Sequence, residues 1–469
     1  MSAGAALPDR LPDNLSDWIA GQRWYQNSGH TPRLSLVGEW ALASPPDGTA
    51  LLTHLLLDDS AGVPTLYQVP LSYRSEPLAG AEGSLVGTID TTEGARWVYD
   101  APHDAAYCSA LVDLIMGEST ALSTASSAGA VAQGHRHPAA EDSRPVFSQV
   151  LRGEQSNTSI IVDTVLADGT PGVPMICKIF RTLHHGENPD IIVQSALAAA
   201  GSTLVPPPVG HVSGTWRAGG PDGGVLDHGH LAFAQQFLPG VRDAWRVALD
   251  AVENGEDFSE RARSLGVATA DVHALLAEIM PTVPATVDER AGVASLMRQR
   301  LAMAVAEVPS LAVYADAVDA VISDAQTADW PALQRIHGDY HLGQVVSVRG
   351  GGWVLLDFEG EPLRPLSERS QPDLTLRDVA GMLRSFDYVG GSYEQSHPGE
   401  SASEWVLSAR HAFLEGYSER SSIDADRYTV LLDAFEIDKA LYEAVYESRN
   451  RPAWLPIPVT AISRLVTLP

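Results

Sequence analysis

Cysteine is almost absent from this chain, because only Cys108 and Cys177 occur among its 469 residues. Two cysteines are too few for a disulfide framework or a cysteine-based zinc site. Cys177 lies within an apolar segment, which predicts a small buried side chain rather than a reactive thiol. The fold must therefore depend on hydrophobic cores, which a chain of this length with 45% hydrophobic residues can supply.

Basic residues are also scarce, with 31 Lys and Arg against 59 Asp and Glu and a net charge of −28. Nucleic acids and anionic membranes attract proteins through basic surfaces. We therefore expect no nucleic-acid partner and no membrane partner. The negative charge does not exclude ATP, since a nucleotide site needs only a few local donors and a metal ion.

No apolar run approaches the roughly 18 residues that a membrane-spanning helix needs. The first ten residues lack the basic region and apolar core of a secretion signal. We expect a cytoplasmic monomer whose partners are small molecules.

The stretch from Arg335 to Glu361 carries the strongest signal in the chain. Two short apolar segments, Val345–Val348 and Trp353–Leu356, flank the residues R-G-G-G, which is a pattern typical of a β-hairpin. Such a hairpin would bring the loop before its first strand beside the end of its second strand. The polar residues brought together in this way are His337, Asp339, Gln344, Asp357 and Glu359.

Carboxylates and an amide at one end of a hairpin suit phosphoryl transfer from a magnesium nucleotide. That reaction needs oxygen ligands for Mg²⁺ and a carboxylate that orients and deprotonates the attacking hydroxyl. Each short motif alone also fits a turn or a solvated strand end. The spacing across the hairpin favours the catalytic interpretation.

A second pair of strands begins near Val146, and a turn of small polar residues joins them. Ser156, Asn157 and Thr158 lie in this turn, where backbone N–H groups could bind phosphate oxygens. Lys178 follows on the strand M-I-C-K-I-F, from which its ammonium could reach the α- and β-phosphates. The alternative is a plain hairpin with an exposed lysine.

These motifs resemble one family over nearly the whole chain. H-G-D-Y-H-L-G-Q-V-V, then D-F-E-G-E-P, then L-R-D-V-A-G-M-L-R-S-F-D-Y is similar to bacterial maltokinases and the related actinobacterial glucosamine kinases. These have the aminoglycoside phosphotransferase and protein-kinase-like fold. The resemblance implies that Asp339 is the catalytic base and that Gln344 and Asp357 bind Mg²⁺, with Glu359 as a further ligand.

The resemblance also implies an α+β bilobal fold with an additional N-terminal cap. We expect the cap at residues 1–118, where W-x-x-x-Q-R-W-Y resembles the maltokinase cap, a β-rich N-lobe at 145–240 and a helical C-lobe at 241–469. Residues 119–144 are rich in Ala, Ser, Gly and His, which predicts a flexible linker or insertion.

Kinase-like folds pair the nucleotide lysine with an acid of the next helix, for which Glu187 and Asp190 are candidates and Asp190 is our choice. In this fold class the strand L-A-F-A-Q-Q-F-L ends in the linker that contacts adenine. The linker candidates are Gln236, Phe237 and Leu238. Asp378 is an alternative to Asp357 as the acid that gives electrostatic support in the site. A simpler explanation is that an acid at the start of a helix interacts favourably with the helix dipole.

The C-terminal segment Y-E-A-V-Y-E-S-R-N-R-P-A-W-L-P-I-P matches the same family and is expected to contact the sugar. The predicted substrate-binding residues are Asp339, His341, Glu443, Glu447, Arg449 and Trp454. Helix packing with a capped end explains the segment equally well.

The acceptor sugar is predicted from two departures from the maltokinase pattern. Gln26-Asn27-Ser28 replaces Ala-Gly-Lys or Ala-Gly-Arg in the cap, and the segment 405–417 lacks an Arg-Asn-Arg run. With acids retained nearby, the acceptor side should be acidic and favour a protonated amine. The acids are Glu415, Asp438, Glu443 and Glu447. We therefore expect D-glucosamine to be phosphorylated to glucosamine 6-phosphate. Conversion of maltose to maltose 1-phosphate is the alternative, and a non-catalytic kinase-like binding module is a remote one.

Overall fold

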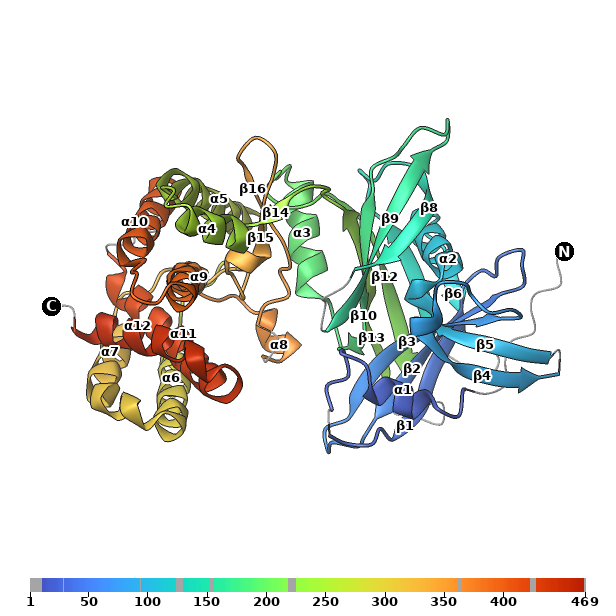
Figure 1. Ribbon diagram of the computed structural model, residues 1–469, viewed down its shortest axis with the longest axis horizontal. Helices are drawn as coiled ribbons and strands as arrows, with labels where there is room; N and C mark the ends of the chain where they lie inside the picture. The colour runs from blue at the N-terminus through green and yellow to red at the C-terminus, as the bar shows by residue number, and fades with distance from the viewer. Residues whose placement is uncertain are drawn as a thin grey trace. The chain divides into compact units, whose positions relative to one another are not determined.

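The computed structural model of the chain describes residues 11–27, 29–92, 94–123, 130–151, 156–217, 225–361, 364–421 and 427–467. Ser28 of the cap motif lies outside these residues. The chain divides into two compact units. The first unit comprises residues 1–191 and 207–238, and the second comprises residues 192–206 and 239–469 (Figure 1).

The first unit begins with a sheet in the order β1-β2-β3-β5-β4, to which β11 adds by pairing with β3. Its elements are α1 (Leu15–Ala20), β1 (Leu34–Ala41), β2 (Ala50–Asp58), β3 (Thr65–Arg74), β4 (Leu85–Thr91), β5 (Gly94–Asp100) and β11 (Thr182–Leu183). Leu55, Val69 and Leu71 are fully buried in these strands. Most of this sheet lies within residues 1–118, where the cap was expected.

A seven-stranded sheet follows in the order β6-β7-β12-β13-β10-β9-β8. Its strands are β6 (Thr120–Leu122), β7 (Val131–Arg136), β8 (Ser143–Val150), β9 (Asn157–Leu166), β10 (Met175–Phe180), β12 (Pro208–Arg217) and β13 (Leu226–Gln236). The helix α2 (Ala105–Met116) packs against β7, β8 and β12. Asp104 caps this helix by accepting a hydrogen bond from the amide of Ala106.

The predicted linker at residues 119–144 is wrong for the part that the structure describes, because β6 and β7 belong to this sheet. The small residues of the segment have a packing role. A Cβ atom on Gly134 would lie 1.9 Å from the carbonyl oxygen of Leu114 in α2. Glycine at this position therefore permits the close approach of α2 and β7. The richness of residues 119–144 in small residues, which had indicated a loop, reflects this packing.

A buried arginine links the two sheets of the first unit. Arg181 is fully buried, and its guanidinium donates to both carboxylate oxygens of Asp100 at 2.8 and 2.7 Å. The same guanidinium lies 5.0 Å from the ring of Trp24. Gln68 of β3 donates to the carbonyl oxygens of Phe180 and Leu231 at 2.8 Å each. The cap is therefore joined to the second sheet by charged and polar contacts as well as by β11.

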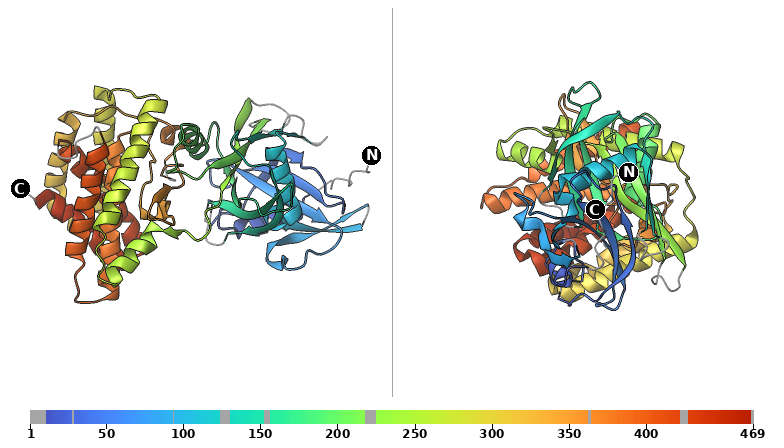
Figure 2. Two further views of the ribbon diagram at one scale, coloured as in Figure 1. Left: turned by 90° about the horizontal axis from the view of Figure 1, so that it is seen from above. Right: turned by 90° about the vertical axis from the view of Figure 1, so that its right-hand side faces the viewer.

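The second unit is helical apart from a small sheet in the order β14-β15-β16. Its strands are β14 (Arg242–Asp243), β15 (Val345–Ser347) and β16 (Trp353–Leu355), and its helices are α4 (Ala244–Glu253), α5 (Ser259–Ile279), α6 (Val287–Glu307), α7 (Ala315–Thr327), α8 (Leu366–Arg369), α9 (Thr375–Ser396), α10 (Ser403–Arg420), α11 (Thr429–Asn450) and α12 (Pro456–Thr467). The helix α3 (Pro189–Ala199) begins in the first unit. α5 packs along α10, and α9 packs along α11 (Figures 1 and 2).

Local sequence signals explain where several of these helices start. Thr286 and Glu289 form a capping box at the start of α6, in which each side chain bonds the other residue's backbone N–H. Asp243 accepts from the amide of Arg246 at the start of α4. The helical C-lobe expected at 241–469 is thus present, with a small sheet as its one departure among the described residues.

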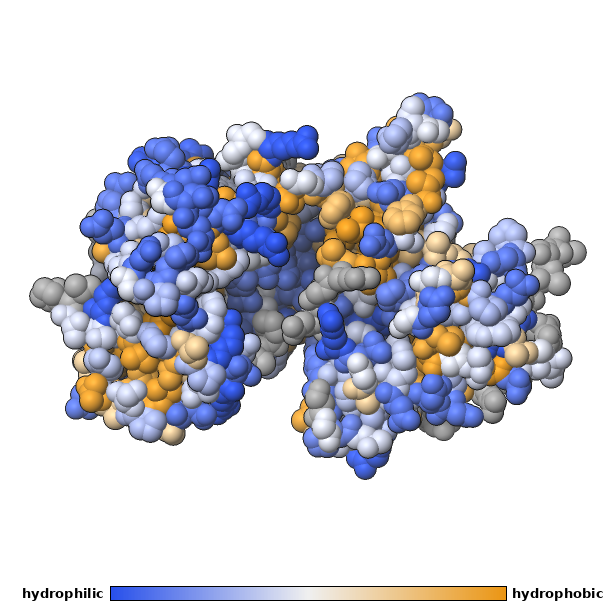
Figure 3. Space-filling model, viewed as in Figure 1, coloured by the Kyte–Doolittle hydropathy of each residue, from blue (hydrophilic) through white to orange (hydrophobic). Residues whose placement is uncertain are grey.

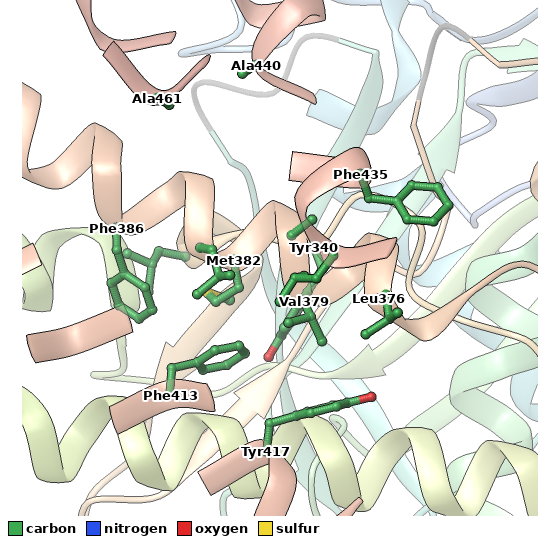
Figure 4. Packing of buried hydrophobic residues seen from close by; sticks show 14 of the residues in the cluster. Tyr340, Leu376, Val379, Met382, Phe386, Phe413, Tyr417, Phe435, Ala440 and Ala461 are labelled. Carbon is green, nitrogen blue, oxygen red and sulfur yellow. The ribbon is translucent and has the colours of Figure 1, made fainter. Parts of the chain in front are cut away.

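The core of the second unit surrounds the segment that carries the predicted catalytic residues. Figure 4 shows Tyr340 beside Val379 and Met382 of α9, with Phe413 and Tyr417 of α10 nearby. The hydroxyl of Tyr340 lies 2.8 Å from that of Thr269 in α5. The neighbours of Asp339 in the sequence are thus fixed by packing.

Hydrophilic residues cover most of the visible face of the second unit (Figure 3). Among the described residues, no helix is both long enough and apolar enough to cross a membrane.

Candidate active site

The predicted hairpin is present and brings the two polar segments together as expected. β15 and β16 pair antiparallel, with Val346 opposite Val354. The side-chain amide of Gln344 donates to Oδ2 of Asp357 at 3.2 Å. The ring of His337 lies 2.8 Å from the carbonyl oxygen of Leu356, which ties the loop to the end of β16.

Asp357 has a backbone conformation that few residues other than glycine adopt, with φ at +64°. Aspartate tolerates this left-handed conformation better than most residues, but it still costs free energy. Such strain is common where a side chain must be aimed at a ligand. Asp357 lies two residues after the end of β16, and its carboxylate contacts the side chain of Gln344.

Gln344, Asp357 and Glu359 fit a hard divalent cation. Mg²⁺ prefers carboxylate and amide oxygens, which these side chains supply. Arg369 lies beside these acids, and its guanidinium donates to the carbonyl oxygen of Glu359 at 3.2 Å. Burial lowers the pKa of Arg369, and the charges of Glu359 and Asp357 oppose this shift.

Asp339 lies in a small network of charges. Its Oδ1 is 3.4 Å from Nζ of Lys439 in α11, and its Oδ2 is 4.0 Å from Nε2 of His341. Burial acts against the charge of Lys439, but Asp339 and Glu361 outweigh it and raise the pKa of the lysine. Burial lowers the pKa of His341, although Asp339 opposes this shift. Lys439 therefore stays charged and faces the carboxylate of Asp339.

Asp378 supports the catalytic loop from the first turn of α9. It is buried, and its carboxylate accepts from the backbone amides of His337 at 2.8 Å and Gly338 at 2.9 Å. His273 of α5 contacts the same carboxylate at 3.0 Å. Burial acts to raise the pKa of Asp378, but the contacts with His273, His337 and Gly338 lower it overall. Asp378 therefore positions the loop, a role that neither of our sequence interpretations contained.

Replacing Asp378 with asparagine should disturb the loop without removing a group that touches substrate. We expect kcat to fall at least about tenfold, because small misplacements of a catalytic group are costly. The pKa of Asp378 is depressed in the folded protein, so its contribution to stability is present at neutral pH and is lost as pH falls through that depressed value. The variant should thus be less stable near pH 7 and differ less from the wild type in acid. Thermal unfolding at both pH values checks this, and an unchanged kcat would contradict the positioning role.

A pocket of about 530 Å³ opens beside the catalytic loop in the second unit. Its lining residues are Trp245, His341, Gly343, Gly381, Ser385, Tyr388, Ser392, Lys439, Glu443, Arg451 and Trp454. A Cβ atom on Gly381 would lie 2.5 Å from the carbonyl oxygen of Tyr340, so glycine lets α9 approach the loop. Asp339 is not among the lining residues, but Lys439, which lines the pocket, lies 3.4 Å from its carboxylate.

Aromatic side chains form one wall of this pocket. The rings of Tyr388 and Trp454 are stacked with centroids 6.0 Å apart. The guanidinium of Arg451 lies 4.8 Å from the ring of Trp454. An aromatic wall with charged groups at its edge suits the apolar face and hydroxyls of a sugar. Of the predicted acceptor residues, His341, Glu443 and Trp454 line this pocket.

The remaining C-terminal predictions are corrected by the structure. Arg449 is exposed and pairs with Glu307 of α6 at 2.9 Å, so it does not line the pocket. Arg451, two residues later, lines it instead. Glu447 is buried behind the wall, where it accepts from the hydroxyl of Tyr388 at 3.0 Å and from Nε of Arg451 at 2.9 Å. It positions those side chains and is absent from the lining.

The expected acidic character of the acceptor side is wrong. Among the lining residues, Glu443 is the one carboxylate, whereas Lys439 and Arg451 are cations. Arg384 donates to Oε2 of Glu443 at 2.9 and 2.7 Å. Burial raises the pKa of Glu443, and Arg384 and Lys439 oppose the shift.

Asp438 and Glu415, which were also expected to make the acceptor side acidic, each have a cationic partner. Asp438 is buried against Arg300 of α6, and Glu415 lies on the surface 3.6 Å from Arg263. Buried carboxylates need cationic partners, and the sequence did not reveal where those partners lie.

The first unit carries the predicted nucleotide residues. Nζ of Lys178 on β10 lies 3.7 Å from Oδ2 of Asp190 in the first turn of α3, which confirms the choice of Asp190. Glu187, the other candidate, is exposed in the segment before α3. The lysine is therefore held by a buried acid of the next helix, as in kinase-like folds.

Thr158 does not belong to the tip of the phosphate loop. It lies in β9, and its buried hydroxyl accepts from Nε of Arg181 at 2.8 Å. Asn157 begins the strand, and its amide lies 3.4 Å from the exposed hydroxyl of Ser156. The preceding turn lies outside the described residues. Ser156 and Asn157 remain predictions for phosphate contact.

The predicted adenine linker is half-exposed at the end of β13. The amide of Gln236 donates to the carbonyl oxygen of Pro207, and that of Phe237 donates to Pro174, each at 2.8 Å. Both N–H groups thus already have partners in the protein. The contact of Gln236, Phe237 and Leu238 with a nucleotide remains a prediction.

Sequence reasoning missed Lys439, Arg384, Arg451 and the loop-anchoring role of Asp378. A usable signal was present in α11, where charged residues recur on the face that also carries the apolar stripe. Glu436, Asp438, Glu443 and Glu447 are all buried there. Charges on the core face of a helix indicate paired or functional groups.

Two family models match the chain in the expected order. One described as "Maltokinase N-terminal cap domain" matches residues 18–104. The other, described as "Phosphotransferase enzyme family", matches residues 150–397, which is more than half of the chain.

Curated relatives and solved structures extend the likeness over most of the chain. The glucosamine kinase of Streptacidiphilus jiangxiensis is 28% identical over 420 residues, covering 82% of this chain and 89% of that protein. The glucosamine kinase of Mycolicibacterium smegmatis is 27% identical over 344 residues, covering 68% and 81%. A structure of a glucosamine kinase with glucosamine, ADP and inorganic phosphate is similar with a TM-score of 0.65 at 22% identity, covering 98% of this chain and 100% of that one. At that identity the structural likeness establishes the fold.

Proposed function

The chain belongs to the phosphotransferase enzyme family, and from this premise we propose that it transfers the γ-phosphate of ATP to the 6-hydroxyl of D-glucosamine. The observation that carries the proposal is the match along most of both chains to a curated glucosamine kinase. A similar fold is found in a complex with glucosamine, ADP and phosphate, which further supports this acceptor. The proposal places the reaction in the cytoplasm, where ATP is available.

Asp339 acts as the general base in this proposal. Its carboxylate accepts the proton of the acceptor hydroxyl as that oxygen attacks the γ-phosphorus, while the bond from phosphorus to the β–γ bridging oxygen breaks. Lys439, 3.4 Å away, keeps positive charge beside the carboxylate and the reacting oxygens. Asp378 holds the backbone of the loop so that Asp339 has one orientation.

Lys178 and the proposed metal ligands act on the phosphates of ATP. Asp190 holds the ammonium of Lys178, which then neutralises negative phosphate oxygens. Gln344, Asp357 and Glu359 would hold Mg²⁺, which supplies charge neutralisation to the transferring phosphoryl group when bound. Each protein group lowers the barrier by positioning and by charge, with no covalent intermediate on the protein.

The pocket beside the catalytic loop is the proposed sugar site. Trp454 and Tyr388 face the apolar side of the ring, and Arg451 reaches hydroxyls at its edge. Arg384 occupies Oε2 of Glu443, so Oε1 is the oxygen that meets the ammonium of glucosamine. A charge-assisted hydrogen bond of this kind distinguishes the amine from a hydroxyl.

The two alternatives have weaker support. A maltokinase would fit the cap model, but the curated relatives named above are glucosamine kinases. A non-catalytic binding module would not need Lys178, Asp339, Gln344 and Asp357 together, and all four are present.

Replacing Glu443 with glutamine should weaken glucosamine binding selectively. Loss of a hydrogen bond to a charged group costs about 1.5–3 kcal/mol, so the KM for glucosamine should rise about tenfold or more. The KM for ATP should stay nearly constant because Glu443 lines the sugar pocket. Initial rates at varied glucosamine and fixed saturating ATP measure the effect.

Glu415→Gln is the matched control for this prediction, since Glu415 is an exposed acid of α10. The control should leave both KM values unchanged. An unchanged KM for glucosamine in Glu443→Gln would remove the amine contact from Glu443.

The proposed reaction is tested by identifying its product. The purified protein is incubated with ATP, Mg²⁺ and glucosamine, and phosphorus and proton NMR spectra locate the new phosphomonoester. We expect stoichiometric ADP and a phosphate on C6. Absence of ADP formation above a sugar-free control, or phosphorylation at C1 of maltose alone, would contradict the proposal.

A further inference from the structure

Two histidines and an aspartate gather in the first unit, where β13 begins beside the segment that precedes α3. His185 and Asp227 form an ion pair through Nδ1 and Oδ1. The rings of His185 and His228 have centroids 4.8 Å apart. One ligand atom from each of the three residues lies within 4.8 Å of the others. None of the three takes part in the proposed phosphoryl transfer.

The backbone holds these side chains near one another. Gly186 forms a parallel β-bridge with Gly229, and the amide of Gly186 donates to the carbonyl oxygen of His228 at 2.9 Å. A Cβ atom on Gly229 would lie 2.5 Å from the carbonyl oxygen of His184, so glycine permits this approach. Oδ1 of Asp227 also accepts from the amide of His228 at 2.8 Å. The segment before α3 and the start of β13 are therefore held together by backbone contacts that need no ion.

Two imidazoles and a carboxylate suit a borderline metal ion better than Mg²⁺ or Ca²⁺. Zinc bonds to nitrogen and carboxylate oxygen are about 2.0–2.2 Å, which places tetrahedral ligand atoms about 3.3 Å apart. The observed separations need a modest closure. The side chain of His185 is 72% exposed and can rotate to provide it. Water can complete the coordination at an exposed position.

We propose that His185, Asp227 and His228 bind a divalent transition-metal ion of the zinc class, and that this ion fixes the segment 184–188 against β13. This site is separate from the Mg²⁺ site of the proposed reaction and does not depend on the identity of the sugar.

The fixed segment leads directly to the acid that holds the nucleotide lysine. The amide of Asn188 donates to Nδ1 of His230 on β13 at 2.8 Å, and Oδ1 of Asn188 accepts from the amide of Asp190 at 2.8 Å. Asp190 in turn pairs with Lys178 at 3.7 Å. An ion bound by His185, Asp227 and His228 would therefore strengthen the attachment of this segment to β13, immediately before the helix that carries Asp190.

Zinc binding to the untagged protein tests the site, with excess Mg²⁺ present so that hard-cation sites are filled. Competition against a chromogenic zinc chelator gives the affinity and the number of equivalents. We expect one equivalent that is lost or weakened by about tenfold or more in His185→Ala, in His228→Ala and in Asp227→Asn. Equal binding by the wild type and a His185→Ala/His228→Ala double variant would overturn the site.

His411→Ala is the matched control because His411 is also an exposed histidine beside a carboxylate, with Glu415 at 3.4 Å. It should bind zinc as the wild type does. Hydrogen–deuterium exchange tests the second part of the proposal. Zinc should slow exchange in residues 184–190 of the wild type and leave His228→Ala unchanged, whereas no slowing in the wild type would overturn the fixing of this segment.

Discussion

Replacing Asp339 with asparagine should lower kcat by about 10²–10⁴-fold, the usual effect of losing a general base. Asparagine keeps the size of the side chain but cannot accept the proton of the acceptor hydroxyl. Lys439 retains Glu361 as a partner at 3.9 Å, so the local charge balance is only partly disturbed. Steady-state kinetics with saturating ATP and sugar measure the loss, and calorimetry should show nearly unchanged nucleotide affinity.

Asp329→Asn provides the control for a general effect of removing one acid. Asp329 is exposed and pairs with Arg427 on the surface. Its replacement should leave kcat and the melting temperature unchanged. If Asp339→Asn kept more than about a tenth of the wild-type kcat, a loss far below that expected for a base, another residue would have to accept the proton.

Replacing Asp357 with alanine should lower kcat/KM by about 10²–10³-fold. This is the usual effect of removing one group that stabilises charge in the transition state. The carboxylate is the proposed metal ligand nearest to Gln344. Excess Mg²⁺ or Mn²⁺ should restore part of the activity, because the remaining oxygens can still bind the ion more weakly. Rates measured over a range of metal concentrations for the wild type and the variant check this.

Glu359→Gln is the comparison variant for the metal site. We expect a smaller loss than for Asp357→Ala and a smaller shift in the metal concentration that gives half-maximal rate. A metal dependence that is unchanged in Asp357→Ala but shifted in Glu359→Gln would move the main ligand role to Glu359.

The hairpin of β15 and β16 was predictable because its signals are local. The apolar segments, the glycine turn and the polar residues at both ends lie within 27 residues, and their pairing requires only the two strands to meet. The Lys178–Asp190 pair was predicted from the resemblance to kinase-like folds, in which an acid of the next helix holds the nucleotide lysine.

The charge state of the acceptor pocket was not predictable in this way. Glu443 is paired with Arg384 of α9, and Asp438 with Arg300 of α6. These partners lie 59 and 138 residues away in the sequence. Counting only the nearby acids therefore gave the wrong sign for the net charge of the pocket. The expectation of glucosamine had rested on this count, and its present support comes from the relatives and from the single pocket acid Glu443.

The predictions for Arg449 and Thr158 failed because the sequence does not show in which direction a side chain points. Arg449 and Arg451 are two residues apart at the end of α11, and only the chain direction after the helix decides which one faces the pocket. Thr158 was assigned to a turn, but β9 begins at Asn157 and directs its hydroxyl toward Arg181.

The measurement that tests the central claim most directly is the comparison of kcat/KM for glucosamine, N-acetylglucosamine, glucose and maltose at one pH with one enzyme preparation. Glucosamine should have the highest value, and N-acetylation should lower it strongly because it removes the ammonium that Glu443 is proposed to bind. A higher value for maltose, or equal values for glucosamine and N-acetylglucosamine, would contradict this account.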